Sequence, residues 1–307
     1  MSPDLATDYR HLREDAAARG GTREVVAVAG PDAADYLQGQ CSQDLLPLGV
    51  GGAADTLLLA PDGKVEVLAR VVRLGPEVFH LDVDVGYRDV LVARLSRFKL
   101  RSKLTVEPLD WTCVSVRGPV ADALTGLSAP VVAPVAWGSL SGVDLLGPPS
   151  AVEVPDALAA CGAEAWEAAR IESGIPAMGR ELGHGEIPAE TGTVERTVSF
   201  TKGCFTGQEL VARIDSRGGS APQRLHGLVL EVEVDPEELL GAPLAPDAAA
   251  RPLGRVTSAA VCPGLGAVGA LAYVHRSVPV PSRVQVVTAR PDRKAAAWAE
   301  VRPLPLR

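Results

Sequence analysis

The chain has 307 residues, and its 30 lysine and arginine residues against 38 aspartate and glutamate residues give a formal net charge of −8. A hydrophobic content of 47% and a charged content of 22% are typical of globular proteins and exclude a wholly disordered chain. The acidic balance argues against an extended basic groove, so we expect no direct nucleic-acid partner. The length predicts about two domains, or three small ones.

Two long stretches, residues 123–143 and 256–274, contain no charged side chain and are long enough to suggest membrane segments. Prolines and glycines interrupt both, and a helix broken in this way would leave backbone groups without partners in lipid. We therefore predict buried strands and turns there, and no membrane partner. The N-terminus lacks the basic region and apolar run of a secretory signal, so we expect a cytoplasmic protein.

Strand-like and helical patterns alternate through the first third of the chain. The strand-like runs are short and apolar, and the turn signal Pro61-Asp62-Gly63 separates two of them, as in a β-meander. Apolar residues between Tyr87 and Phe98 recur at helical spacing and predict core packing of a helix. We predict strands over 25–28, 56–59, 65–72 and 78–83, and helices over 33–37 and 87–98.

The sequence after about residue 110 indicates one more strand and one more helix, followed by a run of strands. The strand begins at Cys113, residues 128–150 are rich in proline and glycine with strands possible among loops, and a short helix covers 164–171. From Leu225 onward the strand-like pieces are joined by Pro/Gly turns, which is typical of a small β-barrel. These pieces cover 225–234, 255–257, 268–274, 283–287 and 297–301. We expect the domain boundary between residues 218 and 219.

The five cysteines stand far apart and form no CxxC or Cys/His ligand spacing, so we expect no metal site and five free thiols. One of them, Cys204, lies between two glycines in the run from Lys202 to Glu209. The ammonium group of Lys202 and a helix expected to start near Gln208 would both favour the thiolate form. The alternative from spacing alone is a glycine turn with a small buried residue.

The run Lys-Gly-Cys-Phe-Thr-Gly-Gln-Glu at 202–209 resembles the signature of the YgfZ family, folate-binding proteins related to the glycine-cleavage T-protein, an aminomethyltransferase. Residues 30–40, 170–176 and 254–258 match further blocks of that family, and the resemblance covers about residues 22 to 290. It implies an α+β, three-domain GcvT-like cloverleaf. Two intertwined α+β lobes would occupy residues 1–218 and form the folate-binding region, and a C-terminal β-barrel would occupy residues 219–307.

The resemblance also implies roles for individual residues. Glu172 takes the position of the T-protein glutamate that binds the pterin, where a carboxylate can accept two neighbouring N–H donors; the alternative is a solvated glutamate near a helix end. Arg213 and Arg217 could bind the glutamate tail of folate, or form surface salt bridges. Gln208 is implied as a further folate contact, and Cys204 with Lys202 as the reactive residues.

Two differences from the T-protein favour one of two functions. T-proteins carry an Asp-Asp pair where this chain has Glu66 and Val67, and they lack the Lys-Gly-Cys signature. The resemblance therefore implies an accessory protein that binds folate, tetrahydrofolate in our expectation, and supports iron–sulfur protein assembly or repair and tRNA modification. Its partners would be iron–sulfur proteins or their assembly machinery, and Cys204 its essential reactive group. The alternative is a tetrahydrofolate-dependent aminomethyl- or methyltransferase, so enzyme activity as a folate-dependent one-carbon transferase stays open.

Overall fold

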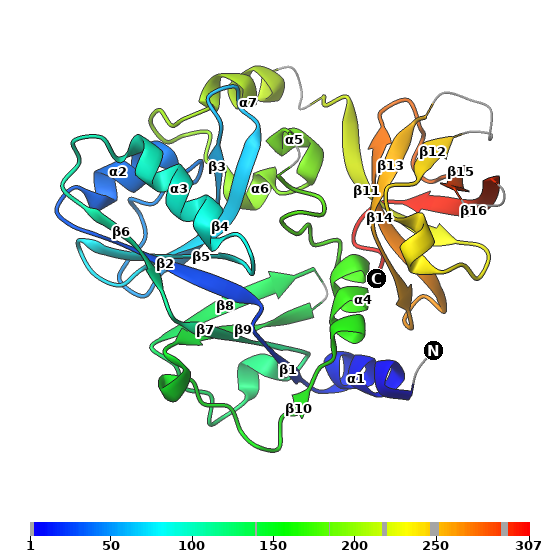
Figure 1. Cartoon of the computed structure of the whole chain (residues 1–307), viewed down its shortest axis with the longest axis horizontal. Coiled ribbons are helices and arrows are strands. Elements are labelled where there is room, and N and C mark those ends of the chain that lie inside the picture. The colour runs from blue at the N-terminus through cyan, green and yellow to red at the C-terminus, as the bar shows by residue number, and fades with distance from the viewer. Residues whose placement is uncertain (1–2, 139, 184, 217–219, 246–251, 290–293) are drawn as a thin grey trace.

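The computed structural model describes residues 3–138, 140–183, 185–216, 220–245, 252–289 and 294–307. The described chain forms two five-stranded sheets and one closed six-stranded barrel, which lie beside one another (Figure 1). The chain contributes one strand to one sheet, then forms the whole of the other sheet, and returns to complete the former before it enters the barrel. The predicted α+β fold with two intertwined lobes and a C-terminal barrel is therefore confirmed.

The first sheet has the strand order β3-β4-β5-β2-β6 and forms the core of the first lobe. The antiparallel neighbours β3, β4 and β5 are the predicted meander. Helix α3 buries Leu91 and Leu95 against this core, as the helical spacing predicts. The elements are β2 (Arg23–Ala29), α2 (Ala33–Gln40), β3 (Ala53–Leu59), β4 (Val65–Arg73), β5 (Val78–Asp84), α3 (Arg88–Lys99) and β6 (Thr105–Leu109).

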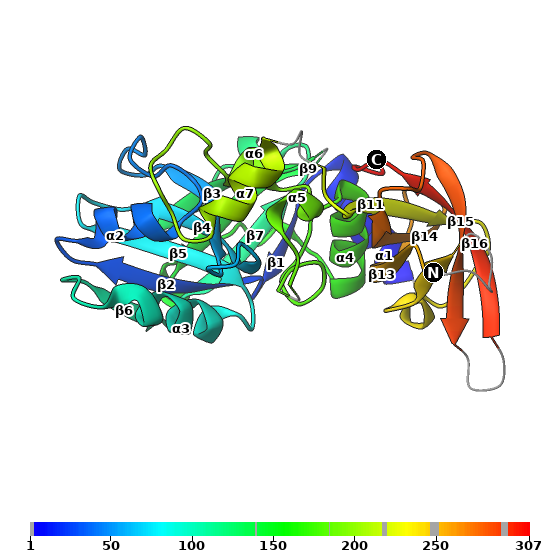
Figure 2. The same cartoon turned by 90° about the horizontal axis from the view of Figure 1, so that it is seen from above.

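The second sheet has the order β10-β1-β7-β9-β8. Its β8–β9 hairpin occupies much of the region where the sequence indicated loops with strands among them. Helix α1, which the sequence did not predict, packs against α4, and α4 in turn contacts the barrel (Figure 2). The elements are α1 (Pro3–Glu14), β1 (Ala17–Gly20), β7 (Thr112–Arg117), β8 (Val131–Trp137), β9 (Leu140–Gly147), β10 (Ala159–Ala160) and α4 (Ala163–Ser173).

Three short helices lead from α4 back to the first lobe and on to the barrel. They are α5 (Pro188–Thr191), α6 (Val194–Thr197) and α7 (Gln208–Asp215). Helix α6 contacts β3 of the first sheet, and α5 contacts β11, the first strand of the barrel. The predicted domain boundary at 218/219, within residues 217–219, lies outside the described residues and stays a prediction.

The barrel is closed in the order β11-β14-β13-β12-β15-β16. Its interior is filled by aliphatic side chains such as Leu228, Val256 and Val286. The β13–β14 hairpin covers the second stretch without charges, so the prediction of buried strands and turns is confirmed there. None of the helices in the described chain is long and apolar enough to cross a membrane. The strands are β11 (Gln223–Leu230), β12 (Pro243–Ala245), β13 (Gly254–Cys262), β14 (Ala267–His275), β15 (Ser282–Ala289) and β16 (Lys294–Arg302).

A buried network of charged residues joins the two sheets. On the first sheet, Arg70 donates hydrogen bonds of 2.9 and 3.1 Å to Asp82. The same guanidinium group lies 2.9 Å from Asp144 on the second sheet, and Asp144 also pairs with Arg117 at 2.8 Å. Burial alone would raise the pKa of Asp144, but Arg117 and Arg70 hold it well below its usual range. The carboxyl group of Asp144 is therefore ionised at neutral pH.

We expect Asp144→Asn to lower the free energy of unfolding by about 3–5 kcal/mol, because it leaves buried arginines without their counter-charge. Because the pKa of Asp144 is lower in the folded than in the unfolded chain, the ionised carboxyl group stabilises the fold at pH values above its unfolded-state pKa of about 4. This stabilisation is lost as the pH falls from about 4 toward the folded-state pKa. Urea unfolding at neutral and acidic pH tests both effects, because the acid-induced loss of stability should be smaller in the variant. The control is Asp62→Asn, at an exposed residue. Equal urea midpoints for the two variants would contradict the prediction.

Candidate functional site

The signature run at 202–209 forms a loop that leads into α7. Phe205 is packed in the core of the first lobe and Lys202 is also buried, whereas Gly203 and Cys204 between them are exposed. The side chains on either side of Cys204 are therefore anchored while its thiol faces solvent. Helix α7 begins at Gln208, as the sequence predicts.

The side chain of Lys202 reaches the end of α2. Its ammonium group donates hydrogen bonds of 2.6, 2.7 and 2.9 Å to the backbone carbonyl oxygens of Gln38, Cys41 and Gln43. A lysine has three protons to donate, and all three are engaged here. Burial lowers the pKa of Lys202, and the carbonyl oxygens take the place of its lost water. This geometry makes Lys202 an anchor of the loop; its effect on the thiolate of Cys204 stays a prediction.

The glycine and glutamine of the signature shape the same loop. Gly207 has a φ of 81°, and a Cβ atom there would lie 2.6 Å from the carbonyl oxygen of Ala60 in the β3–β4 turn. A larger residue would therefore be strained and would also collide with the turn. The side-chain oxygen of Gln208 accepts a hydrogen bond of 3.3 Å from the backbone N–H of Phe205. Gln208 thus braces the loop, and its contact with folate stays a prediction.

Cys204 is the exposed thiol among five free cysteines. Burial raises the pKa of Cys41 to about 11 and that of Cys113, Cys161 and Cys262 to about 12. Thiols that are buried and stay protonated at neutral pH are poor nucleophiles and poor metal ligands. The accessible thiol chemistry of the chain is therefore concentrated at Cys204.

Glu66 and Val67, which the resemblance places where T-proteins have an acidic pair, both have structural contacts. Glu66 lies 2.5 Å from Arg94 and 2.7 Å from Arg97, both on α3. Val67 is fully buried in the core of the first lobe. The one carboxylate at this position is therefore neutralised by two arginines.

Arg94 and Gln40 connect this position to the signature loop. Besides its contact with Glu66, Arg94 donates 2.8 and 2.9 Å hydrogen bonds to the carbonyl oxygen of Leu59 and to the side chain of Gln40. Gln40 also accepts a 3.4 Å hydrogen bond from the hydroxyl of Thr206. Sequence reasoning missed these two residues; an arginine on the core-facing side of a predicted helix was the signal that a buried polar partner was required.

Glu172 is fully buried at the end of α4. One carboxylate oxygen accepts hydrogen bonds from the hydroxyl of Tyr9 and from Arg13, the latter at 2.5 Å, and the other accepts one of 3.2 Å from the backbone N–H of Gly264. Burial, together with the neighbouring Glu172 carboxylate, raises the pKa of Tyr9 to about 12. Both oxygens thus have protein partners in this structure, and the implied pterin contact of Glu172 stays a prediction.

The remaining predicted contacts are on or after α7. Arg213 is exposed on the last turn of that helix, and Arg217 lies outside the described residues. The structure thus places Lys202 and Cys204 on one loop and Gln208 at the first residue of α7 that follows it. It places Glu172 in a different environment beside α1 and the barrel. Within the described ranges, His, Cys, Asp and Glu form no group of three that could hold a metal ion.

The comparisons with known proteins agree with the fold. No protein-family model matches the chain. The chain is 29% identical over 223 residues to the tRNA-modifying protein YgfZ of Klebsiella pneumoniae, which is 64% of this chain and 66% of that protein. It is 32% identical over 229 residues to the mitochondrial iron–sulfur cluster assembly factor IBA57 of Mus musculus, which is 64% of this chain and 61% of that protein. The chain thus spans slightly less than two thirds of either relative.

A solved structure extends the likeness in fold to nearly the whole chain. The aminomethyltransferase T of the Bartonella henselae glycine cleavage system matches with a TM-score of 0.82 and 20% identity, covering 99% of this chain and 89% of that chain. At this identity the match speaks for the fold alone. The chain is thus similar in sequence to YgfZ and IBA57 proteins, and its fold is that of the GcvT-like aminomethyltransferases.

Proposed function

We propose that the chain is a folate-binding accessory protein that supports the assembly or repair of iron–sulfur proteins and, through them, tRNA modification. The observation that carries the proposal is Cys204, an exposed thiol on a loop that Lys202 and Phe205 anchor on either side. The two relatives in sequence, a tRNA-modifying protein and an iron–sulfur cluster assembly factor, support the same role.

The position of the thiol suits work on another protein. An assembly factor must reach a metal ion or a thiol that belongs to its partner, so its own reactive group has to lie at the surface. The thiolate is the form of cysteine that attacks disulfides and binds metals. The exposed thiol of Cys204 meets this requirement. Cys41, whose backbone carbonyl oxygen accepts a hydrogen bond from Lys202, is fully buried and does not meet it.

Folate enters the proposal from the family resemblance. A bound tetrahydrofolate would supply a carrier for one-carbon units. Tyr9 and Arg13 bind one oxygen of the Glu172 carboxylate and Gly264 binds the other, so a pterin at this carboxylate would compete with these contacts. No step of the proposed function depends on that contact.

Tetrahydrofolate titrations by calorimetry test the contact with Glu172. If the pterin binds there, Glu172→Gln should weaken binding by about 1–3 kcal/mol, because the amide presents a donor to the pterin amine. Tyr9→Phe removes a competing donor and should tighten binding. Glu209→Gln, at an exposed residue of α7, is the matched control. Affinity that is unchanged in both Glu172→Gln and Tyr9→Phe would remove Glu172 from the folate site.

The alternative function is a tetrahydrofolate-dependent aminomethyl- or methyltransferase. The likeness in fold to an aminomethyltransferase is compatible with it. Against it stands Glu66, whose carboxylate is paired with Arg94 and Arg97. Turnover with an aminomethyl donor and tetrahydrofolate would favour the alternative, and its absence favours the accessory role.

Replacing the exposed thiol tests the proposed role directly. In cells that lack this protein, we expect Cys204→Ser to fold normally yet fail to restore the activity of an iron–sulfur enzyme. The control is Cys161→Ser, because the buried Cys161 thiol donates a 3.4 Å hydrogen bond to the carbonyl oxygen of Gly162 that a hydroxyl can keep. Cys161→Ser should restore activity. Full restoration by Cys204→Ser would reduce Cys204 to a structural residue.

A further inference from the structure

The most basic stretch of this acidic chain runs from α3 into the segment before β6. Residues 94–103 contain five of its 30 lysine and arginine residues and no acidic residue. The first two, on α3, lie 2.5 and 2.7 Å from Glu66. The other three form no ion pair with any residue that the structure describes; they are Lys99, Arg101 and Lys103. We call residues 99–103 the basic segment, and its charges are free to meet a partner.

Leu100 lies among these charges. It is 88% exposed, the highest value among the exposed large apolar residues of the described chain. Its φ of 45° is one that residues other than glycine rarely adopt, and such strain persists only where the surrounding structure fixes it. Removing an aliphatic side chain from water is favourable in proportion to the area covered, so Leu100 can contribute to the binding of another molecule.

Hydrogen bonds fix the shape of the basic segment. The backbone N–H of Ser102 donates a 2.9 Å hydrogen bond to the carbonyl oxygen of Lys99, and that of Lys103 donates one of 2.7 Å to the carboxylate of Asp32. The next residue, Leu104, is buried in the core of the first lobe. A segment held in this way loses little conformational freedom when it binds a partner.

A hollow of about 680 Å³ opens beside Leu100. Leu100, Arg101 and Ser102 line it from the basic segment, and Asp32 lines it from the turn before α2. The carboxylate of Asp32 is already engaged by the backbone of Lys103. The hollow therefore offers an apolar side chain and a guanidinium group to a side chain that enters from another molecule.

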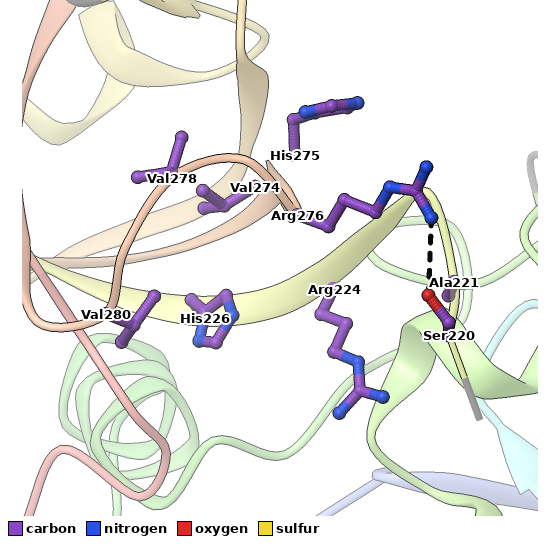
Figure 3. Close-up of a pocket in the computed structure, with 9 residues that line it drawn as sticks. All are labelled: Ser220, Ala221, Arg224, His226, Val274, His275, Arg276, Val278 and Val280. Atoms are coloured by element: carbon purple, nitrogen blue, oxygen red, sulfur yellow. Dashed lines mark hydrogen bonds between the residues drawn. The ribbon is translucent and has the colours of Figure 1, made fainter. Parts of the chain in front are cut away.

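The arginines at one end of the barrel do not form a comparable surface. Arg276 donates a 3.3 Å hydrogen bond to the hydroxyl of Ser220, and Arg224 also interacts with another group of the chain. Figure 3 shows the two guanidinium groups directed away from each other. Their charges are divided between different contacts, whereas those of the basic segment are unpaired and close together in sequence.

Helix α2 connects the basic segment to the signature loop. Asp32, which holds Lys103, precedes this helix, and Gly39 near its end accepts a 3.1 Å hydrogen bond from the backbone N–H of Thr206. Helices α2 and α3 lie side by side in the first lobe (Figure 1). A helix of eight residues spans about 12 Å. A standard interface of about 800 Å² per partner is about 30 Å across, so one partner can cover both Cys204 and the basic segment.

We propose that the basic segment binds an acidic surface on the protein whose metal ion or thiol meets Cys204, with Leu100 packed against an apolar side chain of that protein. The inference rests on the proposed function, which supplies such a partner. Complementary charge raises the rate of encounter and helps to select the partner. The leucine adds apolar contact area at the centre of the charged surface.

Two observations favour an acidic protein over a nucleic acid. Unpaired bases are bound by stacking on aromatic side chains. Phe98, the aromatic residue next to the basic segment, is half-buried and has the guanidinium groups of Arg94 and Arg97 at 4.2 and 4.9 Å from its ring centre. Asp35 on α2 and Glu209 on α7 are exposed, and they would repel a polyanion that extended toward the signature loop.

Fluorescence anisotropy of two labelled polypeptides with the full chain tests the proposal. One is poly-L-glutamate, and the other is a random copolymer of glutamate and tyrosine, which adds apolar contacts. We expect the chain to bind both at low salt and to release them as the salt concentration rises. Replacing Lys99, Arg101 and Lys103 together by glutamine should weaken the binding of both by about tenfold or more. The control removes the same charge from three exposed arginines elsewhere and should bind as the wild type does; it combines Arg10→Gln, Arg180→Gln and Arg255→Gln.

Leu100→Asn tests the apolar contact separately. Asparagine is among the residues that tolerate a positive φ, so we expect the segment to keep its shape. Affinity for the copolymer should fall about threefold, whereas affinity for poly-L-glutamate should not change, because only the copolymer has apolar side chains. Wild-type affinity of Leu100→Asn for the copolymer would contradict the role of Leu100.

The proposal is overturned if neither polypeptide binds at low salt, or if the triple variant and its control lose affinity equally. It is also overturned if a single-stranded oligoribonucleotide binds through the three basic residues while neither polypeptide does, since the segment would then be a nucleic-acid surface. None of these measurements involves the thiol of Cys204. A failure of the proposed function, as shown by full restoration in Cys204→Ser, is therefore distinguishable from a failure of this inference.

Discussion

The carboxylate of Asp144 holds the two lobes in their relative position. It extends from the second sheet and lies between Arg70 of the first sheet and Arg117 of its own. Such charges are stable away from water only when each has a partner at close range, so the network tolerates few other placements of the sheets. The aliphatic residues Val25 and Val72 of the first sheet pack with Val131 of the second around the same junction. The relative placement of the two lobes therefore depends on this junction.

Within the first lobe, the signature loop depends on partners that are distant in sequence. Lys202 binds the carbonyl oxygen of Gln38, 164 residues earlier, and Gly207 fits closely against the β3–β4 turn. The conformation in which Cys204 is exposed is therefore fixed by the core of the lobe rather than by the loop itself. This explains why a short loop with two glycines can present a thiol in a defined place.

The elements that sequence reasoning predicted are those whose signal is local. The spacing of Leu91 and Leu95 was enough for α3, and the strand-like pieces joined by Pro/Gly turns were enough for five of the six barrel strands, whereas the short β12 was missed. Helix α1 was missed because its polar residues meet their partners only in the folded chain, as Arg13 meets Glu172, 159 residues away. Lys202 is the clearest case at the site. Its closeness to Cys204 in sequence suggested an effect on the thiol, whereas its side chain is directed to the end of α2.

The fold exposes the thiol of Cys204 and buries the other four. Alkylation of the native protein with iodoacetamide, followed by mass spectrometry of each cysteine-containing peptide, measures this directly. Cys204 should react at least about 100-fold faster than the other four, since their reaction requires local or global opening of the structure. In urea all five should react at similar rates. A native rate at Cys41, Cys113, Cys161 or Cys262 that equals the rate at Cys204 would contradict the account.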